Sequence, residues 1–487
     1  LQRGALADAE RAAREAVRLS PRSPVARNLL GVILGRAGRR DSALSEFSAA
    51  IRLDPAFVGA RNNMATLLAE RGRVAEAIAE FRRVLEIDPR HAQALSNVAS
   101  LYAGAGDYAR AAEHFARARE AAPGDPQLAL AFIGAAYRAG RKAEADAAAD
   151  QLERSAASDP RALFTLAMAL AQSRQYERAA RLFEQVARLA PRNYEVLYNL
   201  GVALYNLDRN DEAARHLAEA ADLNPAPAET HFRLGLIASD RGDQANAVEE
   251  FRHAVEREPK NPNYQYLLGR EYFRAGFYEG AVKAFTEAMA AEPKNAAYVL
   301  ARADANYRKG EWVAAAADFD LAASLDPGND KITYWQGYAH RAAGNFDLAR
   351  RHLEAYVAKH PDDAEALASL GYVAIEQGRF EDAEPALTRA LQLAPKHAAV
   401  LYDYARLAVK RRDYPEAVAR LRRVIERHPT HTQAHYQLFL AYSRLKQTES
   451  AQQALAEFKR LEALEKRSTE ERIADERLRT QRMLGQR

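Results

Sequence analysis

Aromatic and basic residues recur between positions 198 and 406 at spacings that place them on one side of a helix. Tyr266, Arg270, Phe273 and Arg274 show this clearly, because offsets of four, seven and eight residues share one helical face. Tyrosine and arginine offer large contact area and charge-assisted hydrogen bonds, which suit binding of another protein. The predicted protein-binding residues are Tyr198, Asn199, Tyr205, Phe232, Arg233, Tyr266, Arg270, Phe273, Arg274, Tyr307, Arg308, Tyr334, Tyr338, Arg341, Tyr402 and Arg406.

Histidines are the other side chains that could do chemistry. His431 and His435 are four residues apart and His428 is close, so two imidazoles could share a helical face. A metal site usually needs a third or fourth ligand and supporting hydrogen bonds, and the surrounding sequence offers neither. We therefore interpret these histidines as solvated residues at a helix start, and we predict no metal and no cofactor.

Catalytic sequence motifs are absent from the chain. It contains no HExxH, P-loop, GxSxG or GxGxxG pattern in a suitable context. It also contains no cysteine, which excludes disulfide frameworks, thiolate metal sites and thiol nucleophiles. We therefore predict that the protein is not an enzyme.

Two residue types recur with one fixed period over the whole chain. Proline appears at each step from Pro21 to Pro429, except where Ala157 replaces it, and alanine appears at each step from Ala9 to Ala451. A fixed period of about 34 residues indicates stacked helical hairpins that each contact only their neighbours. Within one period, Leu197, Leu200 and Leu204 form the apolar stripe of a first helix (the A helix), and Glu212–Leu223 forms a second (the B helix).

Small and large residues alternate across the expected helix crossings. Glycine or alanine stands at position 31 and at the equivalent position of most later repeats, and phenylalanine recurs on the following B helix, as in Phe47 and Phe285. We expect these residues to pack together. Glycine after the A helix, as at Gly38 and Gly276, predicts a left-handed residue that ends that helix.

The period, the glycines and the prolines together resemble the tetratricopeptide repeat (TPR) family over residues 1 to about 463. The resemblance implies an all-α fold, an α-solenoid that winds into a right-handed superhelix. It would contain about 13 helix-turn-helix repeats, an N-terminal half repeat and a C-terminal charged helix. It also implies a concave wall of A helices that holds peptides or partner proteins.

The resemblance leaves a structural explanation open for the aromatic face, because rings at these positions in TPR helices also pack on the adjacent repeat. Equivalent positions early in the chain carry Asn28, Asn62 and Ser96. A carboxylate clamp, as some TPR proteins use, would need basic and amide residues over three successive repeats, and Asn199 with Arg233 supplies only part of one. The missing proline at Ala157 predicts a local bend.

Both ends of the array depart from the period. We expect a half repeat made of one B-type helix over residues 1–23, the TPR superhelix over 24–463, and a charged capping or docking helix over 464–487. Ser468 and Glu471 resemble a capping box that would start this last helix. The first residue is Leu1 and not Met, so we favour an exported protein, periplasmic or extracellular, over a cytoplasmic one.

Charge and hydropathy limit the choice of partner. The net charge is +4, with 70 basic and 66 acidic residues, and no concentrated basic stripe predicts nucleic-acid binding. No apolar run is long enough for a membrane span. Two functions remain open. One is a bacterial scaffold that binds a protein segment on its concave face; the other is a structural protein whose copies stack head-to-tail into an extracellular or envelope filament.

Overall fold

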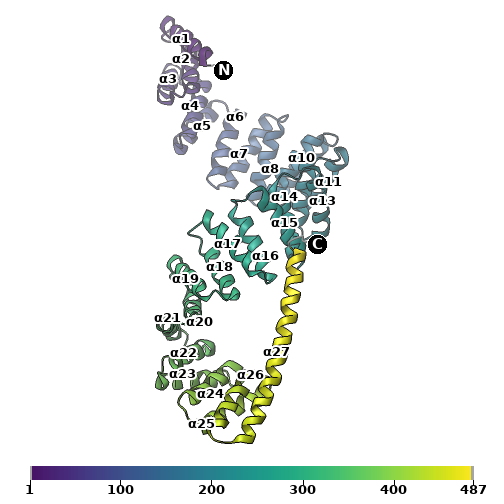
Figure 1. Cartoon of the computed structure of the whole chain (residues 1–487). Helices are drawn as coiled ribbons and strands as arrows, with labels where there is room; N and C mark the ends of the chain where they lie inside the picture. Colours follow the sequence, from purple (N-terminus) through teal and green to yellow (C-terminus); the bar gives the residue numbers. More distant parts are fainter. Residues whose placement is uncertain (1–2, 484–487) are drawn as a thin grey trace. The chain divides into compact units, whose positions relative to one another are not determined.

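The computed structural model describes residues 3–483, and every regular element in this part of the chain is an α-helix (Figure 1). The first helix, α1 (Arg3–Leu19), is the predicted half repeat. Thirteen A and B helix pairs follow, so the described residues contain 27 helices in the predicted solenoid order. The chain is therefore an all-α solenoid.

The A helices begin at the residues that the period predicts. They are α2 (Pro24–Arg36), α4 (Val58–Glu70), α6 (Ala92–Gly104), α8 (Pro126–Arg138), α10 (Pro160–Gln172), α12 (Tyr194–Tyr205), α14 (Ala228–Asp240), α16 (Pro262–Arg274), α18 (Ala296–Lys309), α20 (Asp330–Ala342), α22 (Ala364–Glu376), α24 (Ala398–Lys410) and α26 (Thr432–Arg444). Side chains of Asp, Asn or Ser cap many of their N-termini, as Asn261 does by accepting from Tyr264 N.

The B helices alternate with them. They are α3 (Arg40–Leu53), α5 (Val74–Ile87), α7 (Tyr108–Ala121), α9 (Lys142–Ser155), α11 (Tyr176–Leu189), α13 (Asn210–Leu223), α15 (Gln244–Arg257), α17 (Tyr278–Ala291), α19 (Trp312–Leu325), α21 (Phe346–Lys359), α23 (Phe380–Leu393), α25 (Tyr414–Arg427) and α27 (Thr448–Met483). No helix in the part of the chain that the structure describes combines the length and the apolar character of a membrane span.

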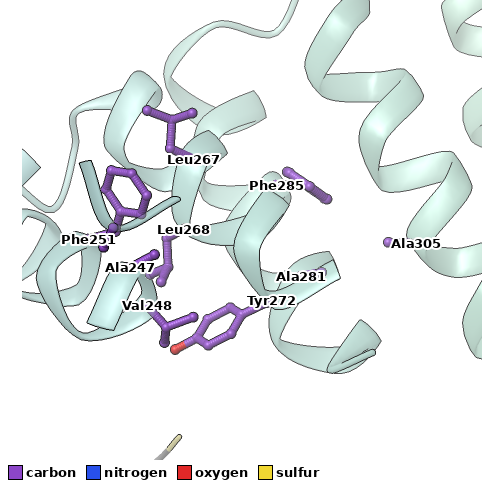
Figure 2. Packing of buried hydrophobic residues seen from close by; sticks show 10 residues of the cluster. Ala247, Val248, Phe251, Leu267, Leu268, Tyr272, Ala281, Phe285 and Ala305 are labelled. Carbon is purple, nitrogen blue, oxygen red and sulfur yellow. The ribbon is translucent and has the colours of Figure 1, made fainter. Parts of the chain in front are cut away.

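The core of each repeat forms where small residues of the A helix meet large residues of the B helix, as predicted. A Cβ atom added to Gly269 would lie 2.6 Å from Phe285, and one added to Gly31 would lie 2.6 Å from Phe47. Figure 2 shows Phe285 among the buried residues of one such region. The alanines of the periodic ladder are fully buried from Ala43 to Ala417. Repeated close packing of this kind gives the solenoid its density.

The turn after the A helix is left-handed, as predicted. Nine glycines at this position have φ between 72° and 89°. Four repeats place a residue with a side chain there, and it keeps a positive φ of 58° to 62°: Arg174, Asp208, Arg412 and Lys446. The hairpin geometry therefore imposes the left-handed conformation even where the local sequence disfavours it.

The chain divides into two compact units, Leu1–Asn224 (unit 1) and Pro225–Arg487 (unit 2). In most repeats the residue before the A helix closes the turn with its N–H, as Asn261 N donates to Glu258 O at 3.1 Å. Pro227 takes this position at the boundary, and proline has no N–H to donate. This boundary is not the bend predicted from the sequence, because it lies two repeats after Ala157. The bend at Ala157 remains a prediction.

The last helix differs from the expectation of a new start at Ser468. α27 runs without interruption for 36 residues, so the last B helix and the charged C-terminal segment are one element. The segment Thr448–Met483 contains neither glycine nor proline and is rich in strong helix formers, so a capping-box pattern at Ser468 does not break it. Residues 484–487 of the predicted terminal segment lie outside the described residues.

Candidate functional site

Aromatic side chains of unit 2 contact each other across successive A helices. The ring centroids of Phe232 and Tyr264, on α14 and α16, lie 5.1 Å apart. Those of Tyr266 and Tyr298, on α16 and α18, also lie 5.1 Å apart. The predicted aromatic residues are half-buried, and Phe232 and Tyr266 pack on the next repeat, as in the structural explanation for the aromatic face.

Further along unit 2, five half-buried side chains from four A helices form a row that we call the aromatic–arginine ladder: Tyr307, Tyr338, Arg341, Tyr372 and Arg406. The rings of Tyr307 and Tyr338 have centroids 5.6 Å apart. The guanidinium of Arg341 lies 4.4 Å from the Tyr338 ring centroid and 5.0 Å from that of Tyr372. The guanidinium of Arg406 lies 4.5 Å from the Tyr372 centroid. Two rings thus meet between α18 and α20, and rings and cations alternate from α20 to α24.

Other aromatic side chains surround the first part of the ladder. Trp335 is 38% exposed, and its ring centroid lies 5.6 Å from that of Tyr338 and 6.4 Å from that of Tyr307. Tyr334 packs against Trp335 and Tyr356, with centroids 5.3 and 5.2 Å away. Burial, with a smaller contribution from Tyr338, raises the pKa of Tyr307 to about 12. Burial also raises the pKa of Tyr334, so both phenols remain neutral hydrogen-bonding groups near neutral pH.

The arginines of the ladder differ in their carboxylate partners. Arg406 Nη1 lies 3.0 Å from Asp403 Oδ1, and Arg406 also pairs with Glu376. Asp403 is 7% exposed, and burial raises its pKa although Arg406 opposes the shift. Among the described residues, Arg341 has aromatic neighbours on two sides and no carboxylate within ion-pair distance. Arg341 is therefore the cation of the ladder that makes no direct ion pair among the described residues, although Asp403 is close enough to interact with its charge.

Arg270 and Arg274, the predicted basic residues of α16, lie beside a carboxylate that the sequence interpretation missed. Glu271 is 1% exposed, and its Oε1 lies 3.1 Å from Arg274 Nη1 and 3.6 Å from Arg270 Nη2. Ser239 on α14 donates to the same oxygen at 2.8 Å. These arginines thus hold a buried carboxylate between successive A helices.

The other predicted binding residues have local contacts. Tyr198 stacks on Tyr194 with centroids 5.9 Å apart, and Asn199 Nδ2 donates to Glu195 O at 2.7 Å. These residues and the half-buried Tyr205 belong to unit 1.

In unit 2, Arg233 pairs with Glu229 and Arg308 with Asp304, each along its own helix. Phe273 packs edge-on against Tyr278 with centroids 5.5 Å apart. Tyr402 packs against His431, with ring centroids 4.5 Å apart.

Of the three C-terminal histidines, His428 and His431 are half-buried and His435 is buried, so the prediction of solvated side chains is wrong for His435. His435 is 8% exposed, and its Nε2 lies 2.9 Å from Pro429 O. His431 is half-buried, and its Nδ1 accepts from Ala434 N, which confirms its position at the helix start. His428 Nε2 lies 2.9 Å from Lys396 O. The rings of His428 and His435 thus lie against backbone carbonyl groups that precede them in the chain, and the ring of His431 lies against an N–H group of its own helix.

The predicted set of binding residues omits Tyr372, which is part of the ladder, and Trp335, which lies beside it. Tyr372 stands one full period after Tyr338, and the sequence already places it on the same aromatic face of the A helices. Glu271 and Asp403 each lie three residues before an arginine of the set, which is an ion-pair spacing on a helix. Their burial depends on how neighbouring helices pack, and sequence spacing alone does not provide that information.

Models of the tetratricopeptide repeat match nearly the whole chain. One model matches residues 1–56, 28–90, 62–126, 130–194, 164–225, 198–262, 266–330 and 334–398, and a second matches 374–425 and 408–462. No curated protein matches the sequence significantly.

Solved structures similar to the chain include two protein complexes. One is the APC/C hetero-tetramer Cut9–Hcn1, with 16% identity, 94% of this chain and 91% of that chain covered, and a TM-score of 0.37. Another is Naa15/Naa10 bound to HypK-THB, with 15% identity, coverage of 97% and 94%, and a TM-score of 0.36.

A third similar structure is the C-terminal part of a TPR repeat-containing protein from Cytophaga hutchinsonii. It shows 17% identity, covers 49% of this chain and 98% of its own, and has a TM-score of 0.40. Because the repeat models span almost the entire sequence and the helices alternate in the matching order, the chain belongs to the tetratricopeptide repeat family, whose solenoids typically act as protein-interaction scaffolds.

Proposed function

We propose that this protein is a non-enzymatic scaffold that binds an extended protein segment across the A helices of unit 2, at the aromatic–arginine ladder. The observation that carries the proposal is the position of Arg341 between the rings of Tyr338 and Tyr372. Stacking orients a planar guanidinium so that its N–H groups point outward from the rings. A carboxylate of a bound segment can then receive two parallel hydrogen bonds.

The surroundings of Arg341 add apolar contact area. Tyr338 and Tyr372 present ring surface next to the guanidinium, and Trp335 packs against Tyr338; tryptophan, tyrosine and arginine are the residues that most often dominate binding energy. A segment with an acidic residue flanked by apolar residues fits this chemistry. The raised pKa of Tyr307 keeps this phenol of the ladder neutral, so it supplies neither a strong nucleophile nor a general base near neutral pH.

Selection from a random peptide library displayed on phage, with the full chain immobilised, tests this proposal. We expect the selected peptides to carry Asp or Glu beside apolar residues. A synthetic copy should lose at least about tenfold in affinity when Arg341 is replaced by alanine, which equals about 1.4 kcal/mol. Binding can be measured by calorimetry and by the fluorescence of Trp335.

Two matched controls distinguish specific recognition by Arg341 from non-specific peptide binding. Asn28→Ala changes a partly buried polar residue on an A helix of unit 1 and should leave the affinity unchanged. A peptide with Asn or Gln in place of its acidic residue should bind the wild-type chain about as weakly as the original peptide binds the Arg341→Ala variant. Equal affinity of wild type and Arg341→Ala would refute the proposed site.

Self-assembly is the second candidate, because apolar side chains at the first helices are exposed. Leu19 is 68% exposed at the end of α1, and Val25 and Leu29 on α2 are 62% and 49% exposed. Such a surface can be covered by another copy of the chain. Light scattering should then show a mass that grows with concentration, and Leu29→Ser should reduce it.

A deletion tests whether the C-terminal segment takes part in this assembly. Any filaments of the full chain should disappear from negative-stain images when residues 468–487 are removed. Filaments that persist would exclude that segment from the contact between copies.

A further inference from the structure

Three side chains from consecutive helices of unit 2 bring metal-ligating atoms together. Asp320 lies on α19, His340 on α20 and His352 on α21, and one ligand atom from each lies within 4.8 Å of the others. His340 Nε2 is 3.2 Å from Asp320 Oδ2. The two imidazole rings are nearly parallel, at an interplanar angle of 5°, with centroids 5.6 Å apart. This cluster plays no part in the proposed binding of a protein segment.

The donor set and its spacing suit a late first-row divalent cation. Two imidazole nitrogens and one carboxylate oxygen are ligands that Zn²⁺ accepts, with bonds of about 2.0–2.2 Å, so two donors on one tetrahedral ion lie roughly 3.3 Å apart. The distance of 3.2 Å between His340 Nε2 and Asp320 Oδ2 is already close to this separation. His352 is half-buried, so a rotation about its side-chain bonds can bring its nitrogen within range.

Two amide side chains support the ligands. Gln336 Nε2 donates to Asp320 Oδ1 at 2.8 Å and so fixes the carboxylate. The side-chain amide of Asn345 lies 3.4 Å from His340 Nδ1, the nitrogen opposite the one that faces Asp320. Partners of this kind orient metal ligands in known sites. His340 is 4% exposed, so its ring is also held by packing.

We propose that Asp320, His340 and His352 form a Zn²⁺ site with three protein ligands, whose remaining position is open to water or to a donor from a partner. The bound cation connects α19, α20 and α21, and therefore two successive repeats. It lies in the same part of unit 2 as the aromatic–arginine ladder, because Tyr338 and Arg341 flank His340 on α20.

A second pair of neighbouring histidines in unit 2 provides a comparison, because its nitrogen atoms do not face a common carboxylate. The rings of His231 and His253 lie 5.2 Å apart, but each is directed to its own carboxylate. His231 Nδ1 is 2.8 Å from Glu250, and His253 Nδ1 is 3.2 Å from Glu256. His253→Gln is therefore a matched control, since it removes an imidazole beside another imidazole without touching the proposed ligands.

Metal titration of the full chain, freed of metal with EDTA and of any histidine tag, tests the proposal. We expect one Zn²⁺ per chain by calorimetry, and Co²⁺ in its place should give the intense visible absorption of a low-coordinate site. His352→Gln and Asp320→Asn should each weaken Zn²⁺ binding by at least about tenfold. His253→Gln should leave the affinity and the Co²⁺ spectrum unchanged.

Circular dichroism of each variant shows whether it is folded. Asp320 has a side chain that is 45% exposed, so Asp320→Asn decides the question if His352→Gln does not fold. Zn²⁺ binding of unchanged affinity in a folded Asp320→Asn or His352→Gln variant would overturn the proposal. So would a Co²⁺ spectrum that matches the hydrated ion.

Discussion

The A helices of the two units pack against their B helices in the same way. They differ in the residues through which neighbouring A helices contact each other. In unit 1, Asn63 on α4 donates to Asn28 on α2 at 3.0 Å, so neighbouring A helices meet through amides. In unit 2, equivalent neighbours meet through aromatic pairs such as Phe232 with Tyr264. The buried alanine ladder is the same in both. One repeat architecture therefore supports two different surfaces, because packing constrains only one side of each A helix.

Ion pairs between the A and B helices of one repeat occur in both units. In unit 1, Arg27 pairs with Glu46 and Arg61 with Glu80, and each pair joins the A and B helices of one repeat. In unit 2, Arg406 joins α24 to Glu376 on α22, so the pair connects successive A helices. Unit 2 also keeps pairs within one repeat, such as His231 with Glu250 and Arg302 with Asp318, and the pair of Arg406 adds a charge that lies within the aromatic face.

The largest expected effect comes from removing Arg270 and Arg274 together. Among the described residues, the double alanine variant leaves the buried Glu271 carboxylate with Ser239 as its remaining donor, and breaking a buried pair costs about 3 kcal/mol or more. The urea midpoint of unit 2 should fall strongly. Tryptophan fluorescence reports this unit, since Trp312 and Trp335 are the two tryptophans of the chain.

Two further variants sharpen that comparison. Arg61→Ala in unit 1 breaks a pair with side chains 16% and 24% exposed, and circular dichroism should show a loss closer to 1 kcal/mol. Adding Glu271→Gln to the double variant should recover stability, because a neutral amide is easier to bury. A double variant as stable as wild type would show that Glu271 does not depend on these arginines.

Equal effects in both units are expected when the shared packing is disturbed. Gly31→Ala and Gly269→Ala each place a Cβ atom 2.6 Å from a phenylalanine ring, and overpacking of this kind costs about 1–3 kcal/mol. Far-UV circular dichroism should detect both changes, whereas fluorescence should detect Gly269→Ala. Clearly unequal losses would mean that the two units do not share one packing scheme.

A smaller gain is expected where a left-handed turn lacks glycine. Arg174 in unit 1 and Arg412 in unit 2 have φ of 58° and 62°, a conformation that costs a residue with a side chain roughly 1 kcal/mol. Arg174→Gly and Arg412→Gly should each raise the urea midpoint slightly. As a control, Gly276→Arg reverses the exchange at φ 80° and should lower it.

The smallest expected effect is an alkaline loss of stability that arises in the ladder. The pKa of Tyr307 is raised from 10.0 to about 12, so the folded protein holds this phenolic proton more tightly than the unfolded chain does. The resulting stabilisation is present below pH 10 and is lost as the pH rises toward 12. Tyr307→Phe should flatten the dependence of the urea midpoint on pH in this range, and Tyr176→Phe in unit 1 serves as the control.

The sequence predicts the helices well because each of their determinants is local and periodic. Start residues such as Pro262, turn residues such as Gly276 and the pairing of Gly269 with Phe285 all follow from spacing within one or two helices. The unit boundary was missed because Pro227 looks like one more proline until its position at the N-terminus of α14 is known. The uninterrupted α27 was missed because a capping box permits a helix start without requiring one.

The candidate site is predicted less completely because it depends on how helices from different repeats face each other. The period identifies the tyrosines and arginines, but not that Arg341 lies between Tyr338 and Tyr372. It does not reveal the cluster of Asp320, His340 and His352 either, since the spacings between these three positions match no recurring ligand pattern. Such juxtapositions depend on the rotation of each helix about its axis.

The division between Asn224 and Pro225 falls between complete hairpins, because α13 closes one repeat and α14 opens the next. A gene cut at this codon therefore leaves every hairpin intact in both products. It is a natural crossover point for chimeras, at which the half with the aromatic surface can be joined to a shorter or longer array without redesigning any hydrophobic contact within a repeat.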